Sequence, residues 1–217
     1  MKTLIALLLL TAFVSAQEGK VSLRFITFPR VKDAGPIELL TGKSVVQLTP
    51  PSNRLSDPVE VAAQDRWRFG KSTEEDGKPA FDDWGTCNAG NARNQIVMLL
   101  RKGPANEDGF HVVCLDDGPK HFKQRQMFFM NLSRQPIAGE VGSVKFALKP
   151  GDQTIISPKP DKGEELCHAT LLLERKKGWH PFLSSNWPLT KQTRGLIFIY
   201  NDPRTAKLRL HTIRDFL

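Results

Sequence analysis

"RQMFFMNLSRQPIAGEVGSVKFALKPGDQ", residues 125–153, repeats a pattern found earlier in the chain, in "SLRFITFPRVKDAGPIELLTGKSVVQLTPPSN", residues 22–53. In each stretch an apolar, aromatic-rich segment ends, a proline follows, a glycine permits a tight turn, and a second apolar segment ends at Leu-x-Pro. An offset of 100 residues makes five of the fifteen positions from 36 to 50 identical. The repeat predicts that both halves build the same supersecondary structure. The identical residues are Pro36, Ile37, Gly42, Leu48 and Pro50, matched by Pro136, Ile137, Gly142, Leu148 and Pro150.

A second similarity links "MLLRKG" and "GFHVV", within residues 98–113, to "LLLERKKGWHPFL" at residues 171–183. Both combine an apolar strand, a basic turn, and then glycine, an aromatic residue and histidine. On this match the first half contains an insertion that the second half lacks. We expect the insertion, residues 65–94, to form a long loop that carries binding residues, because Gly, Asp and Asn are frequent in it.

Most of the chain has the composition of short strands. Eleven segments rich in Val, Ile, Leu, Phe or Thr are separated by clusters of Gly, Pro, Asn and Asp. No window carries apolar residues at helical spacing between helix caps, so we expect no helix beyond a turn or two. The predicted strands are residues 21–28, 44–48, 58–63, 95–101, 109–115, 126–132, 144–148, 153–157, 168–174, 195–201 and 206–213.

These features predict an all-β chain with one of two architectures. Either two related immunoglobulin-like or other β-sandwich units lie in close contact, or two repeats form one larger sandwich. We place the first unit at residues 17–119 and the second at residues 120–217. The segment "DDGPKHFKQR", residues 116–125, is short and polar and leaves the units little freedom of orientation.

The first sixteen residues have the three parts of a cleaved secretory signal peptide. Lys2 is followed by the apolar run of residues 4–10, and Val14-Ser15-Ala16 supplies the small residues of the cleavage site. The run is too short for a membrane span, which needs about 20 residues, and no later segment is apolar enough to cross a membrane. We therefore expect an exported protein, periplasmic or secreted, whose mature chain begins at Gln17.

The chain is basic, with 31 Lys and Arg, 23 Asp and Glu, and a net charge of +8. Loss of Lys2 with the signal peptide leaves 30 basic and 23 acidic residues, or +7. Such a charge attracts polyanions, so an envelope polyanion or a glycan is the partner that composition favours. The basic residues are scattered, which is more typical of a solvated cationic surface than of a dedicated anion site, and we expect no specific nucleic-acid binding.

Three cysteines, Cys87, Cys114 and Cys167, lie beyond the signal segment. In an oxidising compartment they allow one disulfide and leave one thiol. A bond between Cys87 and Cys114 would close a loop of about 27 residues and stabilise the fold by about 3–4 kcal/mol in the chain-entropy model. Cys114 could instead pair with Cys167, and three buried, reduced thiols are a further alternative.

The stretch "FHVVCLDDGPKHFKQRQMFFMNLSRQPIAGEVGSVKFALKPGD" resembles exported bacterial proteins of unknown function. The shared pattern joins an "LDD" strand end to an F-x-N-L-(S/T) strand and then to a G-x-x-x-x-x-L-x-P-G turn. The resemblance covers residues 95–217. It implies a secreted β-sandwich and brings no catalytic residues to transfer. The N-L-S, P-I and G spacing is also similar to small adhesion-type sandwich repeats.

No motif of a metal site or a catalytic centre is complete in the sequence. Cys167 and His168 are adjacent, so on a strand their side chains point to opposite faces, and neither C-x-x-C nor H-x-x-x-H occurs. There is no G-x-S-x-G nucleophile elbow. The pairs Asp82-Asp83 and Asp116-Asp117 stand near glycine, where Asp is favoured as a turn former. We therefore expect no catalytic residue, no metal and no cofactor.

Aromatic residues give the strongest indication of binding, because aromatic rings at the rim of a sandwich can stack on sugars. We expect a non-catalytic exported β-sandwich protein with a binding or scaffolding role at the cell envelope or outside the cell. The alternative is a carbohydrate-binding or carbohydrate-active module that uses the aromatics of residues 65–94. Asn131 also begins an N-L-S glycosylation sequon, which matters only in a eukaryotic secretory pathway. The predicted binding residues are Trp67, Phe81, Asp82, Asp83, Trp84, Trp187 and Arg194.

Overall fold

The chain folds into β-structure, as the sequence predicts. The computed structural model describes residues 19–30, 35–42, 44–103, 108–160, 165–176, 178–202 and 205–217. Within these ranges it has sixteen strands and no helix. The proposed signal peptide, residues 1–16, lies outside the described residues.

Eight strands make the first sandwich unit. One of its sheets has the order β4-β1-β7-β8, and the other has the order β3-β2-β5-β6. β1 and β7 run parallel, with Phe25 beside Val97, whereas the other neighbouring strands of this unit are antiparallel. The strands are β1 (Lys20–Phe28), β2 (Ile37–Thr41), β3 (Ser44–Leu48), β4 (Val59–Ala62), β5 (Arg66–Glu75), β6 (Lys78–Asn88), β7 (Asn94–Arg101) and β8 (Phe110–Asp117).

The second unit has the same topology, strand for strand. Its sheets have the orders β12-β9-β15-β16 and β11-β10-β13-β14, and β9 and β15 are again a parallel pair, with Phe129 beside Ile197. This agreement confirms that the chain contains two related β-sandwich units. The strands are β9 (Met127–Asn131), β10 (Ile137–Val141), β11 (Val144–Leu148), β12 (Gln153–Ile156), β13 (Leu166–Arg175), β14 (Gly178–Pro188), β15 (Thr193–Asn201) and β16 (Leu208–Phe216).

The repeated sequence pattern builds the same hairpin in both units, β2-β3 and β10-β11. In each hairpin the isoleucine that begins the first strand lies opposite the leucine that ends the second. The proline of the pattern, Pro36 or Pro136, stands directly before the first strand. Gly42 and Gly142 begin the turns with φ of +60° and +56°, a region that glycine enters without the steric penalty of a side chain.

The prediction of a long loop at residues 65–94 is wrong. Residues 66–88 of this stretch form the hairpin of β5 and β6, and the second unit has the corresponding hairpin of β13 and β14, with strands of the same 10 and 11 residues. The proposed match of residues 98–113 with 171–183 is also wrong, because β7 and β8 correspond to β15 and β16. The outer half of β5, residues 71–75, is exposed and polar, so this strand lacks the apolar alternation by which strands are recognised.

A large and a small residue exchange places between the two hairpins. In the first unit Trp67 of β5 lies opposite Cys87 of β6, whereas in the second unit Cys167 of β13 lies opposite Trp187 of β14. Trp67 and Cys167 are completely buried, and the other member of each pair packs against the same core. Each sandwich therefore fills this part of its core with one indole and one thiol, as close packing requires.

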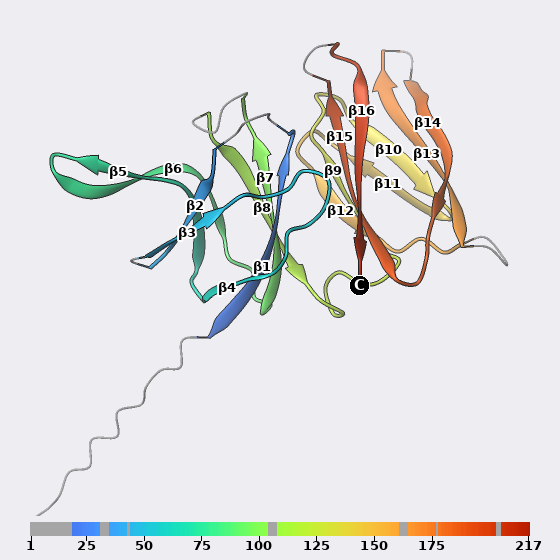
Figure 1. Ribbon diagram of the computed structural model, residues 1–217. Helices are drawn as coiled ribbons and strands as arrows, with labels where there is room; N and C mark the ends of the chain where they lie inside the picture. Colours follow the sequence, from blue (N-terminus) through green and yellow to red (C-terminus); the bar gives the residue numbers. More distant parts are fainter. Residues whose placement is uncertain are drawn as a thin grey trace, which may run out of the picture.

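A third hydrophobic core joins the two units, which lie side by side in Figure 1. Sheet β4-β1-β7-β8 packs against sheet β12-β9-β15-β16, and apolar side chains from both fill the space between them. The inner strands are therefore buried on both faces, and all five residues of β9 are buried. Phe122, in the connection from β8 to β9, adds to this core. The buried members are Ile26, Phe28, Leu55, Ile96, Met98, Leu100, Val113, Phe122, Phe128, Met130, Leu196, Phe198 and Ile213.

Two arginines and two aspartates seal one end of this interface. Arg24 of β1 donates hydrogen bonds to Asp117 of β8 and Asp215 of β16, with N–O distances of 2.9 Å. Arg194 of β15 contacts the same two carboxylates, at 2.6 Å to Asp117 and 2.8 Å to Asp215. Its guanidinium also lies 4.5 Å from the centre of the Phe122 ring and donates to the carbonyl of that residue. Both aspartates are therefore shared between the units, and each buried charge has partners of opposite sign.

Asp117 is held in its charged form. Burial alone would raise the pKa of its carboxyl group, but hydrogen bonds and charge from Arg194 and Arg24 outweigh burial and hold the pKa below its ordinary value. Because the pKa is lower in the folded than in the unfolded chain, Asp117 contributes stability that is fully present above the unfolded pKa of about 3.9. This stability is lost as the pH falls through the lower, folded pKa.

We expect Asp117→Ala to lower the free energy of unfolding by about 3 kcal/mol at pH 7, because it removes one of the two carboxylates that neutralise the buried Arg194. The difference from the wild-type chain should shrink below about pH 4, as the Asp117 carboxyl group of the unfolded wild-type chain, and at lower pH that of the folded chain, takes up a proton. Urea unfolding at a series of pH values measures both effects. Asp83→Ala is the control, because it breaks an exposed pair with Arg68 and should cost less than about 1 kcal/mol. Equal losses for the two variants at pH 7 would contradict the role of the ion pairs.

Candidate functional site

A cleft opens between the two units at the carboxyl ends of β1, β7, β9 and β15. The ion pairs lie at the other end of the interface, near the start of β15 and the ends of β8 and β16. The cleft has a volume of about 1,030 Å³, which is at the upper end of the range of roughly 300–1,000 Å³ for small-molecule sites. It is therefore large enough to hold a ligand.

Both units supply apolar side chains to the cleft. Phe28 and Leu100 come from the first unit, and Met130, Leu132 and Tyr200 come from the second. Phe28 and Tyr200 meet edge to face with ring centroids 4.8 Å apart, a favourable geometry for aromatic pairs. Three of the five residues are also buried members of the core between the units. The cleft is thus the place where that core opens to solvent.

The basic groups of the cleft come from the first unit alone. Arg30 follows β1, Arg101 and Lys102 stand at the end of β7, and His111 lies near the start of β8. Arg30, Lys102 and His111 have no ion-pair partner among the described residues. Within the described ranges, no carboxylate belongs to the lining. The cleft therefore combines apolar surface with positive charge.

Asn131 also lines the cleft, and its side chain is fully used in hydrogen bonds. Its Nδ2 donates to the carbonyls of Gln135 and Leu148. Its Oδ1 accepts from the backbone N–H and the hydroxyl of Ser133. Asn131 is completely buried, so the nitrogen of the sequon is inaccessible in the folded chain, and the side chain fixes the turn after β9.

Two of the predicted binding residues, Trp67 and Trp84, lie in the core of the first unit. The indole of Trp67 is completely buried and donates a hydrogen bond to Oε1 of Gln95 at 2.8 Å. Trp84 is 6% exposed and donates to Asp82. Neither indole offers an open face on which a sugar ring could stack.

Phe81, Asp82 and Asp83 lie together on β6. The guanidinium of Arg68 covers the ring of Phe81 at 5.6 Å and pairs with Asp83 at 2.7 Å. Arg68 and Asp83 are both well exposed, so their ion pair adds little to stability. The three predicted residues are neighbours, but they stand in the outer sheet of the first unit, which contributes nothing to the described lining of the cleft.

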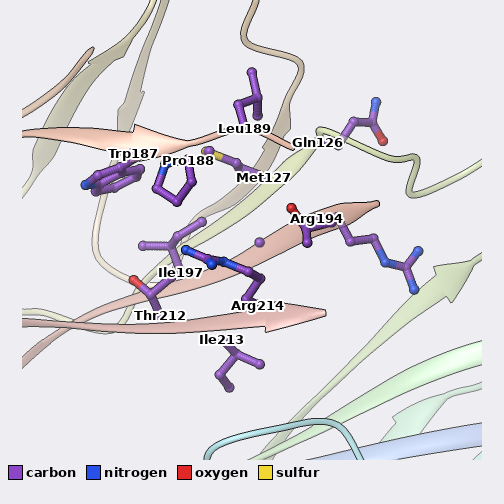
Figure 2. A pocket seen from close by; sticks show the side chains of 12 residues that line it. Gln126, Met127, Trp187, Pro188, Leu189, Arg194, Ile197, Thr212, Ile213 and Arg214 are labelled. Atoms are coloured by element: carbon purple, nitrogen blue, oxygen red, sulfur yellow. The ribbon is translucent and has the colours of Figure 1, made fainter. Parts of the chain in front are cut away.

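Trp187 and Arg194 line a second, smaller pocket beside β15 and β16 (Figure 2), with a volume of about 200 Å³. Figure 2 shows the guanidinium of Arg194 pointing away from Trp187, whereas the side chain of Arg214 extends toward it. Arg194 is committed to the ion pairs of the interface, so its guanidinium is not available to a ligand in this pocket. The pocket is also smaller than typical ligand sites, and we therefore regard the cleft as the candidate site.

Within the described ranges, no group of three or more His, Cys, Asp or Glu side chains is arranged to hold a metal ion. In the same part of the chain, no helix is long and apolar enough to cross a membrane.

Sequence reasoning missed the cleft, because its residues stand at the ends of strands from both halves of the chain. One local signal was present in the sequence. A basic residue follows the apolar end of a strand in Phe28-Pro29-Arg30 and again in Leu100-Arg101-Lys102. This signal shows where charge meets apolar surface, but it does not show that the two places are neighbours.

Cys87 and Cys114 come together across the first sandwich. Cys87 is on β6 of the outer sheet, Cys114 is on β8 of the inner sheet, and the two thiols are hydrogen-bonded to each other. All three cysteines are reduced thiols in the structure. Cys167 is buried in the core of the second unit, so the geometry favours Cys87 over Cys167 as the partner of Cys114.

The same hydrogen bond makes the two thiols chemically different. The hydrogen bond with Cys114 and burial both raise the pKa of Cys87. The hydrogen bond from Cys87 lowers the pKa of Cys114, although burial opposes this effect. Cys114 is therefore the more readily ionised thiol and the expected nucleophile of the pair.

We expect oxidised glutathione to join Cys87 to Cys114 and to leave Cys167 as a thiol. The Cys114 thiolate attacks the small disulfide and releases one glutathione, and Cys87 then displaces the second. Two protein thiols and one oxidised glutathione thus give one protein disulfide and two reduced glutathiones. Thiol titration in denaturant should count three thiols before the reaction and one after it. The Cys167→Ala variant should have two thiols before the reaction and none after it. If the treated variant keeps both thiols, the pairing of Cys87 with Cys114 is ruled out.

The geometry of the cleft is the main indication of function, since no protein-family model matches the chain and no curated protein matches it.

Proposed function

We propose that the protein is a non-catalytic binding protein whose ligand lies in the cleft between the two units. The observation that supports this proposal is the cleft itself, about 1,030 Å³ in volume, with apolar surface drawn from both units. Ligand sites occur preferentially at domain interfaces and combine mainly apolar walls with a few polar groups. The cleft has both properties.

A ligand in the cleft would touch both units at once. It would contact the ends of β1 and β7 on one side and the ends of β9 and β15 on the other. Apolar parts of the ligand would extend the core that holds the units together. Because the unfolded chain has no cleft, such a ligand stabilises the folded state by mass action. The proposed role is to hold a ligand, which agrees with the lack of a complete catalytic motif in the sequence.

The neutral apolar dye N-phenyl-1-naphthylamine tests this proposal, because its fluorescence rises in apolar surroundings. We expect the wild-type chain to bind the dye with a dissociation constant in the micromolar range. Leu132→Trp adds volume to the cleft wall and should weaken binding about tenfold, since the larger indole takes up space that the dye would otherwise fill. A fluorescence titration with the dye excited directly measures both affinities.

Leu166→Trp is the matched control, because it adds the same side chain at an exposed position of β13. This variant should bind the dye like the wild-type chain. Circular dichroism shows whether the two variants keep their strand content. Failure of the wild-type chain to bind the dye would overturn the proposal, and so would equal binding by the wild-type and Leu132→Trp chains.

We further propose that the protein acts outside the cytoplasm after removal of residues 1–16. The charged start, apolar centre and small-residue end of this segment support export. When the full chain is expressed in a cell with a general secretion pathway, the protein should be recovered outside the cytoplasm. Intact-mass spectrometry should then show a chain that begins at Gln17. An uncleaved chain confined to the cytoplasm would count against export.

A further inference from the structure

We infer that the cleft binds a small anionic amphiphile, a molecule with a long apolar chain that ends in one negatively charged group, such as a long-chain carboxylate. This inference rests on the proposed binding function and adds the chemical class of the ligand. Its basis is the separation of charge and apolar surface within the cleft.

The two units contribute different chemistry to the lining. The basic residues all come from the first unit, at the ends of β1 and β7 and the start of β8. The second unit contributes Met130, Leu132 and Tyr200 together with neutral polar groups. A ligand with one charged end and one apolar part matches this division. A uniformly apolar ligand would make no use of the basic residues of the first unit.

Three of the four basic side chains in the lining can meet an anion. Arg30, Lys102 and His111 are exposed and form no ion pair among the described residues. One carboxylate, that of Asp108, comes close to Gly103 at the rim and offsets part of the positive charge. Arg30, Arg101 and Lys102 outnumber this carboxylate, so the local field favours a negative group.

The apolar part of the lining distinguishes an amphiphile from a purely hydrophilic anion. A phosphate or an acidic sugar would pair with Arg30 and Lys102 but would leave Leu132 and Tyr200, which are only partly buried, in contact with water. Each methylene group that covers these side chains adds favourable free energy through burial. A cationic amphiphile would gain the same burial but would meet like charge at the rim.

These observations also orient the ligand. Its charged end lies beside Arg30 and Lys102 at the ends of β1 and β7. Its chain runs along Met130 and Leu132 toward Tyr200. In this orientation the chain continues the core between the units, and the charged end stays close to solvent, where an anion keeps part of its hydration.

Three twelve-carbon amphiphiles test the inference on the full chain: dodecanoate, dodecyltrimethylammonium and dodecyl maltoside. Each competes with N-phenyl-1-naphthylamine below its own critical micelle concentration. Dodecanoate should displace the dye at a concentration about tenfold lower than the cationic or the neutral compound, the size of effect expected from two partly solvated ion contacts.

The double variant Arg30→Ala/Lys102→Ala should weaken dodecanoate binding about three- to tenfold. The matched control is Lys71→Ala/Lys78→Ala, which removes the same charge from exposed positions of the β5-β6 hairpin. This control should bind dodecanoate like the wild-type chain. An equal loss in the two double variants would mean that net charge alone attracts the anion, and it would overturn the inference.

Tyr200 reports the position of the ligand, because it is the single tyrosine of the chain. A chain that carries 3-fluorotyrosine should give one ¹⁹F resonance, and dodecanoate should shift it. Displacement of the dye without a shift would place dodecanoate outside the cleft and overturn the inference. If the dye binds but the three amphiphiles compete equally, the inference of an anionic ligand is overturned and the proposed binding function stands. If the dye does not bind the wild-type chain, the proposed function itself fails.

Discussion

The packing of the two inner sheets against each other is the constraint on which the rest of the structure depends. β1, β7, β9 and β15 bury one face in their own sandwich and the other face in the core between the units. Such strands are nearly continuous apolar runs, as in Ile-Val-Met-Leu-Leu at residues 96–100 and Met-Phe-Phe-Met at residues 127–130. Neither unit could leave its inner sheet in water without exposing an apolar surface of a size that is rare on monomeric proteins. Each unit therefore needs the other.

The interface also shows how the two copies have diverged. Asp117 and Asp215 lie at the carboxyl ends of the equivalent strands β8 and β16 and play equivalent parts in the ion pairs. The arginine Arg24, which pairs with both aspartates, has no equivalent in the second unit. The strand registers place Phe128 of β9 at the position that Arg24 has in β1. The cleft is asymmetric in the same way, with basic residues from the first unit only. The shared topology thus supplies the scaffold, and differences at individual positions supply the chemistry.

The all-β fold and most strands could be predicted, because each of the eleven predicted segments overlaps a strand of the structure. The five strands that were missed, β2, β5, β6, β10 and β14, all belong to the outer sheets. These sheets have one solvent-exposed face, and strands such as Ile-Ala-Gly-Glu-Val in β10 depend on cross-strand pairing more than on apolar content. The candidate site could not be predicted, because Phe28, Lys102, Leu132 and Tyr200 are distant in sequence. Trp67 was wrongly predicted to bind a ligand because of its local sequence. Its polar neighbours do not suggest a strand, yet it lies on β5 and its side chain fills the core.

The position of the cleft follows from the directions of the inner strands. β1 runs parallel to β7, β9 runs parallel to β15, and all four strands end at the same side of the interface. The ion pairs hold the sheets together at the other side of the interface. Leu132 and Tyr200, which are only partly buried, lie at the edge of this core, and within the described residues no further layer covers them completely. Under the proposed function the apolar part of the ligand supplies this layer. Binding and the association of the two units are then coupled, because both draw on the same apolar surface.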